Sequence, residues 1–277
     1  MWNRTLIFAL CASTTTACAV AGHDELIDAA PGGGQGPSVD APATNENIAQ
    51  LLLSEVVLAP TTNEYIEITN PTNVPVPLDH YYLSDNGDYF KLPTAAPTVA
   101  TGDFLVGFPA GATIPAHGVA TIAITTAAVF STAYGASPTY SIGAGSTTMN
   151  KIAANFPSLT DGGEIIVLFY WDGASPLVRD IDIMLAGAPT TANSFINKSG
   201  YQQAGATYGP DADSMPLQSR APAGGTSTKR IAPKAGHVIR GLSNGLTGDD
   251  ETSEMTSATW DAAFTAPTPG SVPAAIR

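Results

Sequence analysis

Charged residues are scarce in this chain of 277 amino acids, and basic residues are the scarcer kind. Asp, Glu, Lys and Arg together make up 13% of the sequence, and 11 basic residues face 24 acidic ones, for a formal net charge of −13. A field of that sign repels phosphate backbones, so the composition argues against nucleic-acid binding. With 27 glycines and 22 prolines, the chain favours many short strands joined by turns over long helices laced with charge pairs.

Cysteine is almost missing as well. The two cysteines are Cys11 and Cys18, and both lie near the N-terminus. The rest of the chain can therefore form no disulfide bond, although an exported protein would be free to use one. Beyond the N-terminal region, no segment reaches the roughly 18 uninterrupted apolar residues of a membrane-spanning helix.

Motifs of well-known enzyme classes are also lacking. The four histidines form no His-x-His or HExxH pair, so the sequence indicates no zinc site; they are His23, His80, His117 and His237. A phosphate-binding P-loop does not occur either. The sequence therefore indicates no particular enzymatic reaction.

The N-terminus is typical of an export signal. Arg4 gives a short basic start, residues 6–12 form an apolar segment, and residues 13–17 are small and polar. Cys18 follows the small Ala17, an arrangement that resembles the lipobox of bacterial lipoproteins. We expect an exported protein with a lipid on Cys18, held at the bacterial envelope on the outer membrane or cell surface.

A second interpretation of this region remains open. Thr15 stands where the lipobox has an aliphatic residue, and Ala19-Val20-Ala21 also fits ordinary signal cleavage before Gly22. Cleavage there would release a soluble secreted protein.

Composition divides the chain into three parts. Residues 1–21 are the export signal, and residues 22–48 are a flexible tether dominated by Gly, Pro, Ala and Asp. Residues 49–273 form the folded body.

Short apolar or alternating segments in the body predict an all-β fold. A helix is predicted over 127–134, ended by Gly135, and long loops over 185–258 with short strands near 229–231 and 238–240. The first three predicted strands are expected to pair in chain order. Strands are expected over 51–58, 64–70, 74–83, 89–92, 104–108, 119–125, 164–171 and 177–184.

Alternation also predicts which side chains are buried. The nearly continuous apolar segment 164–171 predicts a central strand buried on both faces. On neighbouring strands, Glu64 and Glu67 are expected to face solvent, as are Asp180 and Asp182. Paired carboxylates of a glycosidase would be the alternative role for these residues.

Several segments together resemble the lamin-tail domain family. The early block is the most specific part, with Tyr65 at a position where the family usually has Trp. The similarity runs in order from about residue 50 to 270, and relative to the family this chain has insertions near 136–158 and 186–226. Its segments are SEV at 54–56, EYIEITNP at 64–71, VPL at 76–78, YLSD at 82–85, IPAHG at 114–118, FSTAYG at 130–135, LTDGGE at 159–164, STKR at 227–230, Trp260 and TPG at 268–270.

The resemblance implies an immunoglobulin-like antiparallel β-sandwich, in agreement with the strands expected from alternation. Members of the family chiefly bind and tether, and the exported bacterial ones often accompany nuclease or phosphatase domains, for which this chain has no room. The resemblance says little about the ligand.

The best candidates for metal ligands lie near the C-terminus. Asp249, Asp250, Glu251 and Glu254 supply hard oxygens suited to calcium, although their spacing is not that of an EF-hand. Asp211 and Asp213 could join them. Acids solvated in a loop are the expected state, with calcium as the alternative.

Half of the basic residues after the signal fall in one stretch with no acid inside it. Pairing with the acids just downstream is the expected role, and a site for an anionic surface polymer is the alternative. The residues are Arg220, Lys229, Arg230, Lys234 and Arg240.

We therefore expect a non-catalytic binding or structural module that is anchored at the envelope or secreted. It would attach to the membrane by its lipid and bind an envelope protein or a surface polymer. Two alternatives remain: a calcium-dependent hydrolase with its site in the 185–258 loops, and a carbohydrate-binding sandwich with exposed coplanar aromatic rings such as Tyr201 and Tyr208.

Overall fold

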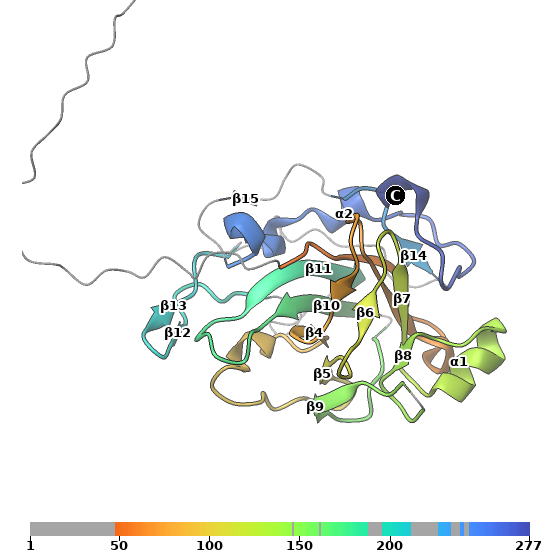
Figure 1. Cartoon of the computed structure of the whole chain (residues 1–277), viewed down its shortest axis with the longest axis horizontal. Coiled ribbons are helices and arrows are strands. Elements are labelled where there is room, and N and C mark those ends of the chain that lie inside the picture. The colour runs from red at the N-terminus through yellow and green to blue at the C-terminus, as the bar shows by residue number, and fades with distance from the viewer. Residues whose placement is uncertain are drawn as a thin grey trace, which may run out of the picture. The chain divides into compact units, whose positions relative to one another are not determined.

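Two five-stranded sheets packed face to face form the body of the protein (Figure 1). The computed structural model describes residues 48–145, 147–160, 162–187, 196–211, 227–233, 239–240 and 244–277, all of which fall in the unit Asn45–Arg277. The export signal, the tether up to residue 47, His23 and Cys18 lie outside the described residues. The expected all-β sandwich is confirmed.

The first sheet has the order β14-β1-β2-β7-β8, with a parallel pairing only between β7 and β8. Its strands are β14 (Thr228–Lys229), β1 (Leu52–Val57), β2 (Tyr65–Thr69), β7 (Val119–Ala123) and β8 (Tyr140–Ser141). The second sheet is antiparallel throughout, in the order β11-β10-β4-β5-β9. Its strands are β11 (Arg179–Gly187), β10 (Gly163–Tyr170), β4 (Tyr81–Ser84), β5 (Phe104–Gly107) and β9 (Asn150–Ala154).

Three two-stranded pairings and two helices complete the described fold. Neither helix is long and apolar enough to cross a membrane, a statement that covers the described residues only. The strands are β3 (Val76–Pro77) with β6 (Thr113–Ile114), β12 (Gln202–Gln203) with β13 (Ala206–Thr207), and β15 (Ile239–Arg240) with β16 (Asp249–Asp250); the helices are α1 (Ala127–Tyr134) and α2 (Thr256–Thr259).

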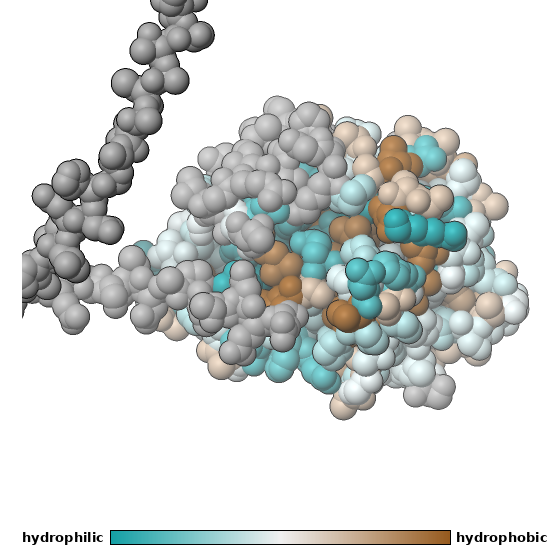
Figure 2. Space-filling view, turned by 45° about the horizontal axis from the view of Figure 1, so that its top comes forward, coloured by the Kyte–Doolittle hydropathy of each residue, from teal (hydrophilic) through white to brown (hydrophobic). Residues whose placement is uncertain are grey.

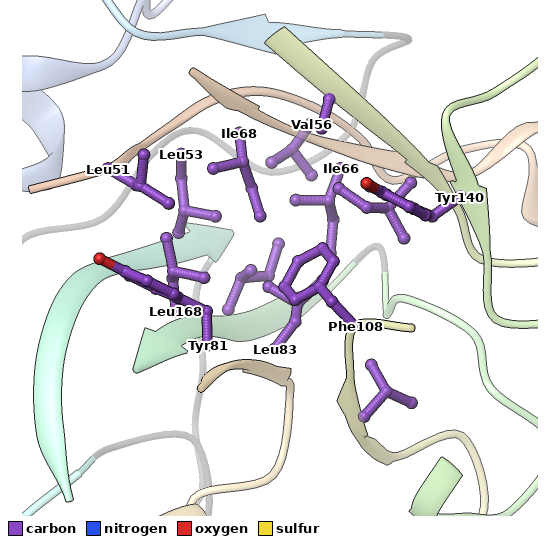
Figure 3. Close-up of a cluster of buried hydrophobic side chains, with 14 of the residues drawn as sticks. Leu51, Leu53, Val56, Ile66, Ile68, Tyr81, Leu83, Phe108, Tyr140 and Leu168 are labelled. Atoms are coloured by element: carbon purple, nitrogen blue, oxygen red, sulfur yellow. The ribbon is translucent and has the colours of Figure 1, made fainter. Parts of the chain in front are cut away.

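The main core lies between the two sheets (Figure 3). Leu53 and Ile66 of the first sheet share it with Leu83 and Leu168 of the second, and all four are fully buried. A β-bulge at Ser54 shifts the pairing of β1 with β2 between Leu53 and Glu55. Because the extra residue resets the alternation, Leu53 and Val56 both reach the core.

A second apolar cluster covers the outer face of the second sheet. Phe169 and Leu105 project from the sheet, and Tyr89, Phe90 and Tyr208 come from the segments that lie over it. Since β10 has core residues on one face and this cluster on the other, the prediction of a central strand buried on both sides is confirmed.

Helix α1 forms where the sequence predicts it. The Thr126 hydroxyl accepts a hydrogen bond from the backbone N–H of Val129 at 3.2 Å, which caps the first turn. Gly135 ends the helix with a φ of 69°, a left-handed conformation that glycine adopts without strain. Phe130 anchors the helix against Tyr65, with the two ring centroids 5.6 Å apart.

Two strand predictions are wrong. The segment 74–83 is not one strand, because a turn separates β3 from β4. In this turn the backbone N–H of Tyr81 donates to the carbonyl of Leu78. Residues 89–91 form a 3-10 helix instead of a strand. The expected pairing in chain order holds only for β1 and β2, since the turn before Tyr81 carries the chain into the second sheet, where β4 lies between β10 and β5.

Leu168→Ala tests the inter-sheet core. Leu168 is fully buried there, so we expect its truncation to lower the free energy of unfolding by about 2–5 kcal/mol. Val74→Ala removes methyl groups from a side chain that is 60% exposed and should change stability by less than about 0.5 kcal/mol. Urea unfolding followed by circular dichroism measures both, and equal small effects would contradict the assigned core.

Candidate functional site

Strand β11 places two aspartates in the interior instead of on the surface. Asp180 and Asp182 are both fully buried, so the prediction that they face solvent is wrong. Both faces of β11 are covered, and a β-bulge places the two aspartates on opposite faces: Leu168 pairs with Asp182 and Phe169 with Asp180, which leaves Ile181 unpaired. Asp182 therefore lies beside the core, and Asp180 lies on the outer face, which the second apolar cluster covers.

Asp182 belongs to a buried ion cluster with Arg230. Nη2 of Arg230 lies 2.7 and 2.6 Å from the two carboxylate oxygens of Asp182, and Nη1 lies 3.0 Å from Oε1 of Glu254. Nε of Arg230 donates to the carbonyl of Leu53, while the N–H of Leu53 donates to Asp182, both at 2.6 Å. The Trp260 ring, 5.2 Å from the guanidinium carbon, packs against the cation.

Electrostatics hold this cluster in its charged form. Burial alone would lower the pKa of Arg230, but the charges of Asp182 and Glu254 outweigh burial and raise the pKa above its usual value. The cluster ties both sheets to the C-terminal segment, because its residues come from β11, β1, the end of β14 and the segment after β16.

The expected calcium ligands are buried, and the expectation of acids solvated in a loop is wrong. Asp249, Asp250, Glu251 and Glu254 are each at most 3% exposed. Oxygens of Glu251, Glu254 and Asp182 lie within 4.8 Å of one another, a spacing compatible with a metal ion. The Arg230 guanidinium already contacts Asp182 and Glu254, so these residues suit an arginine better than a metal. Asp249 and Asp250 lie instead in β16, paired with β15.

A second buried ion cluster lies on the outer face of β11. Nζ of Lys198 lies 2.9 Å from Oδ2 of Asp180 and 2.9 Å from Oδ1 of Asp211. The Tyr89 hydroxyl donates to Oδ1 of Asp180 at 2.5 Å, and the Tyr89 ring centroid lies 5.8 Å from the Lys198 nitrogen. The side chains of Lys198 and both aspartates are fully buried.

The pKa shifts in this second cluster follow from burial and charge. Burial raises the pKa of Asp211 to about 6, although the charge of Lys198 acts in the opposite direction. Burial would lower the pKa of Lys198, but Asp180 and Asp211 hold it above its usual value. Burial and the neighbouring Asp180 raise the pKa of Tyr89. Burial also raises the pKa of Asp250, while the charge of Lys198 acts in the opposite direction.

A third group of acids holds the C-terminal segment on the first sheet. Glu55 and Glu67 are directly opposite each other on β1 and β2, and both are fully buried. Glu55 accepts hydrogen bonds at 2.9 Å from the N–H and the hydroxyl of Thr268, and Glu67 accepts one from the N–H of Gly270. The prediction that Glu64 and Glu67 face solvent is wrong, because this segment covers Glu67 and because Glu64, also fully buried, bonds the N–H of Leu159 at 2.9 Å.

Of the candidate anion patch, the structure describes the side chains of Lys229 and Arg230. Arg230 is 1% exposed and pairs with Glu254, as expected from the acids downstream. Nζ of Lys229 lies 3.7 Å from Glu55. Arg240 is described only through the backbone of β15, and Arg220 and Lys234 lie outside the described residues, as do Asp213 and His237.

The aromatic residues expected for a carbohydrate platform do not form one. Tyr208 is 2% exposed, and its hydroxyl donates to the carbonyl of Phe90 at 2.8 Å and accepts from the N–H of Val178 at 3.0 Å. The rings of Tyr201 and Tyr208 are inclined by 39°. Tyr208 is therefore a packing residue of the outer apolar cluster.

A hollow of 340 Å³ lies beside the start of β1 and the C-terminus. The acids of the three clusters described above do not line it. Its lining is mainly apolar and consists of Gln50, Leu52, Pro71, Pro233, Ala275, Ile276 and Arg277.

Sequence reasoning did not anticipate Lys198 or Tyr89, and it found Asp180 and Asp182 only as surface acids. A lone Lys198 in a polar segment carries no local signal, and the alternation of β11 is misleading because of the bulge at Ile181. A buried ion cluster becomes visible only when segments distant in sequence are brought together.

Comparison with known proteins gives a similarity in structure but no family. The chain matches no family model and no curated protein. Among solved structures, it is similar to the crystal structure of a DUF4876 family protein from Bacteroides thetaiotaomicron VPI-5482, with a TM-score of 0.47 and 12% identity over 82% of this chain and 75% of that chain.

Replacing Arg230 by Met should be strongly destabilising. The change leaves Asp182 and Glu254 buried without their cation, and we expect it to lower the free energy of unfolding by about 3–5 kcal/mol. Lys91→Met is the matched control, because its partner Asp88 is exposed and such pairs contribute at most about 1 kcal/mol. Similar losses for the two variants in denaturant titrations would show that the cluster is not structurally important.

Stability should also depend on the proton of Glu67. Burial raises the pKa of this carboxyl to about 7 from the 4.5 of an exposed Glu, so the folded chain binds more protons than the unfolded chain between these values. Its contribution therefore makes the free energy of unfolding fall as pH rises from 4.5 to 7.

Glu67→Gln should reduce that slope, since Gln resembles the protonated acid and does not titrate. Asp79→Asn, at an exposed position, removes the same charge and should leave the slope in place. Chemical denaturation at a series of pH values compares the three proteins, and an unchanged slope in Glu67→Gln would refute the assignment.

Proposed function

We propose that the protein is a non-catalytic, lamin-tail-like module of the bacterial cell envelope that binds or holds another envelope component. The observation that carries the proposal is the use of the buried acids. Asp182 and Glu254 neutralise Arg230, Asp180 and Asp211 neutralise Lys198, and Glu55 fixes the C-terminal segment. These carboxylates serve the scaffold, so binding is assigned to the surface loops.

The residues that resemble the lamin-tail family support the proposal, because the early and late segments meet. Glu67, in the early block, bonds the N–H of Gly270 at the close of the resemblance. Arg230 forms a β-bridge with Trp260, so these two late positions are also adjacent. Residues far apart in the chain thus act together as one scaffold, as expected of a tethering domain.

The surface is compatible with binding through small contacts. On the face shown in Figure 2, apolar residues occur in small groups separated by hydrophilic ones. Among the described residues, the large apolar side chains that are clearly exposed are Val74, Val129, Phe156 and Ile231.

The two alternatives have less support. A hydrolase using Asp211 with the 249–254 acids would need these groups in an open site, whereas Asp211 and all four acids are buried. A carbohydrate platform at Tyr201 and Tyr208 would need exposed, coplanar rings, and Tyr208 is buried.

Lipid attachment is tested by metabolic labelling with palmitate in a bacterial host. We expect label on the wild-type chain and its loss, with release from the membrane fraction, in Cys18→Ala, because a thioether lipid needs that sulfur. Cys11→Ala is the matched control and should keep the label. Unlabelled wild-type protein, or label that persists in Cys18→Ala, would contradict the anchor.

Binding is tested with the full chain immobilised and exposed to purified envelope fractions, with and without calcium. Saturable retention of one defined component, without its chemical alteration, is the expected result. Turnover of the retained component would contradict a non-catalytic role, and retention that appears only with calcium would favour a metal-dependent site.

A further inference from the structure

The cluster around Lys198 has the composition of a bond-forming site as well as of an ion pair. A primary amine and two carboxyl groups meet with N–O distances of 2.9 Å, and the three side chains are fully buried. Asp180 comes from β11, Lys198 from the segment before β12, and Asp211 from the segment that follows β13. An amine held against a carboxyl group in a dry interior benefits from the large effective concentrations of intramolecular reactions.

The contacts are short, yet they do not have hydrogen-bond geometry. Nζ of Lys198, Oδ2 of Asp180 and Oδ1 of Asp211 have no partner that satisfies the angles of a hydrogen bond. The amine thus lies against both carboxyl groups away from the directions that would hold it in a well-formed ion pair. Nearby aromatic rings of Tyr89 and Phe169, 5.0 Å apart, help to keep water from the cluster.

We propose that Lys198 and Asp180 join through an amide bond between their side chains, formed by the folded protein itself. The Nζ–Cγ bond forms, the Cγ–Oδ2 bond breaks, and water leaves. An ammonium and a carboxylate thereby give a neutral amide and one water molecule, so atoms and charge balance without an oxidant, a reductant or a metal.

The neighbouring groups supply the proton transfers. One ammonium proton passes to Oδ2 of Asp180, which makes Cγ electrophilic and leaves Nζ as a free amine that attacks it. The Tyr89 hydroxyl, 2.5 Å from Oδ1 of Asp180, stabilises the negative charge that develops on this oxygen. Asp211 accepts the second proton from nitrogen and returns it to the Oδ2 hydroxyl, which departs as water.

The different surroundings of the two aspartates decide their roles. Tyr89 donates to Asp180, and this polarises the carboxyl group that is attacked. Oδ2 of Asp211 instead accepts a hydrogen bond from the backbone N–H of Lys198, and this bond favours the ionised carboxylate. Burial raises the pKa of Asp211 to about 6, a value that suits a group which takes up and returns a proton. Because the resting Lys198 is protonated, bond formation is expected to be slow and to follow folding.

The bond would fasten the outer layer to the sandwich. Lys198 lies in the segment that, with Tyr208, covers the outer face of the second sheet, and Asp180 lies on β11 of that sheet. A covalent bond between them would restrict the conformations of the unfolded chain, and it would oppose separation of this layer from the sheet.

Mass spectrometry of the purified full-length protein tests the proposal. Trypsin should cut an unreacted chain after Arg179, Lys198 and Arg220. We expect the wild-type protein to resist cleavage after Lys198 and to give one fragment, residues 180–220, lighter than its sequence by one water, with fragmentation placing the link between Lys198 and Asp180. Lys198→Arg, which keeps the charge, should show no water loss.

Two further variants separate the roles of the acids. Asp180→Asn should lose ammonia instead of water if position 180 is the acceptor, whereas Asp211→Ala should remain uncrosslinked while circular dichroism shows a folded chain. Lys91→Met is the control and should crosslink as the wild type does. Full sequence mass and normal cleavage after Lys198 in folded, aged wild-type protein would overturn the proposal, and a link to Asp211 would overturn the assigned acceptor. Both results are independent of whether the protein binds an envelope partner.

Discussion

The buried pair of Arg230 and Asp182 is the interaction on which the sandwich depends most. A guanidinium in an apolar interior is costly unless every donor finds an acceptor, and here it bonds Asp182, Glu254 and the carbonyl of Leu53. These partners belong to both sheets and to the segment after β16, so one side chain fixes three parts of the chain relative to one another.

The same principle organises the other face of β11 and the first sheet. Lys198 serves two aspartates under the outer apolar layer, while Glu55 and Glu67 receive the C-terminal segment. The protein has few charged residues, and many of them are buried in its interior. That arrangement favours one specific docking of each covering segment.

The fold class, helix α1 and the buried strand β10 could be predicted from the sequence, because each depends on local periodicity and on end signals such as Thr126 and Gly135. Exposure of the acids could not. Alternation assigns one face to Asp180 and Asp182, but the bulge at Ile181 places them on opposite faces, and both faces are covered. Glu67 is covered by a segment about 200 residues later in the chain. The ion clusters depend on these tertiary contacts, so the sequence predicted only part of the candidate site, namely Asp211 and the pairing of Arg230 with acids downstream such as Glu254.

Two of the β-bulges have a joint consequence for strand register. One lies at Ser54 in β1 and the other at Ile181 in β11, and the N–H of Leu53 and the carboxylate of Asp182, each next to a bulge, bond directly. A slip of either strand by one residue would therefore turn its core side chains outward and separate Asp182 from both Leu53 and Arg230. The bulge in each sheet thus fixes the strand register of the other, so that the two sheets reach their correct registers only together.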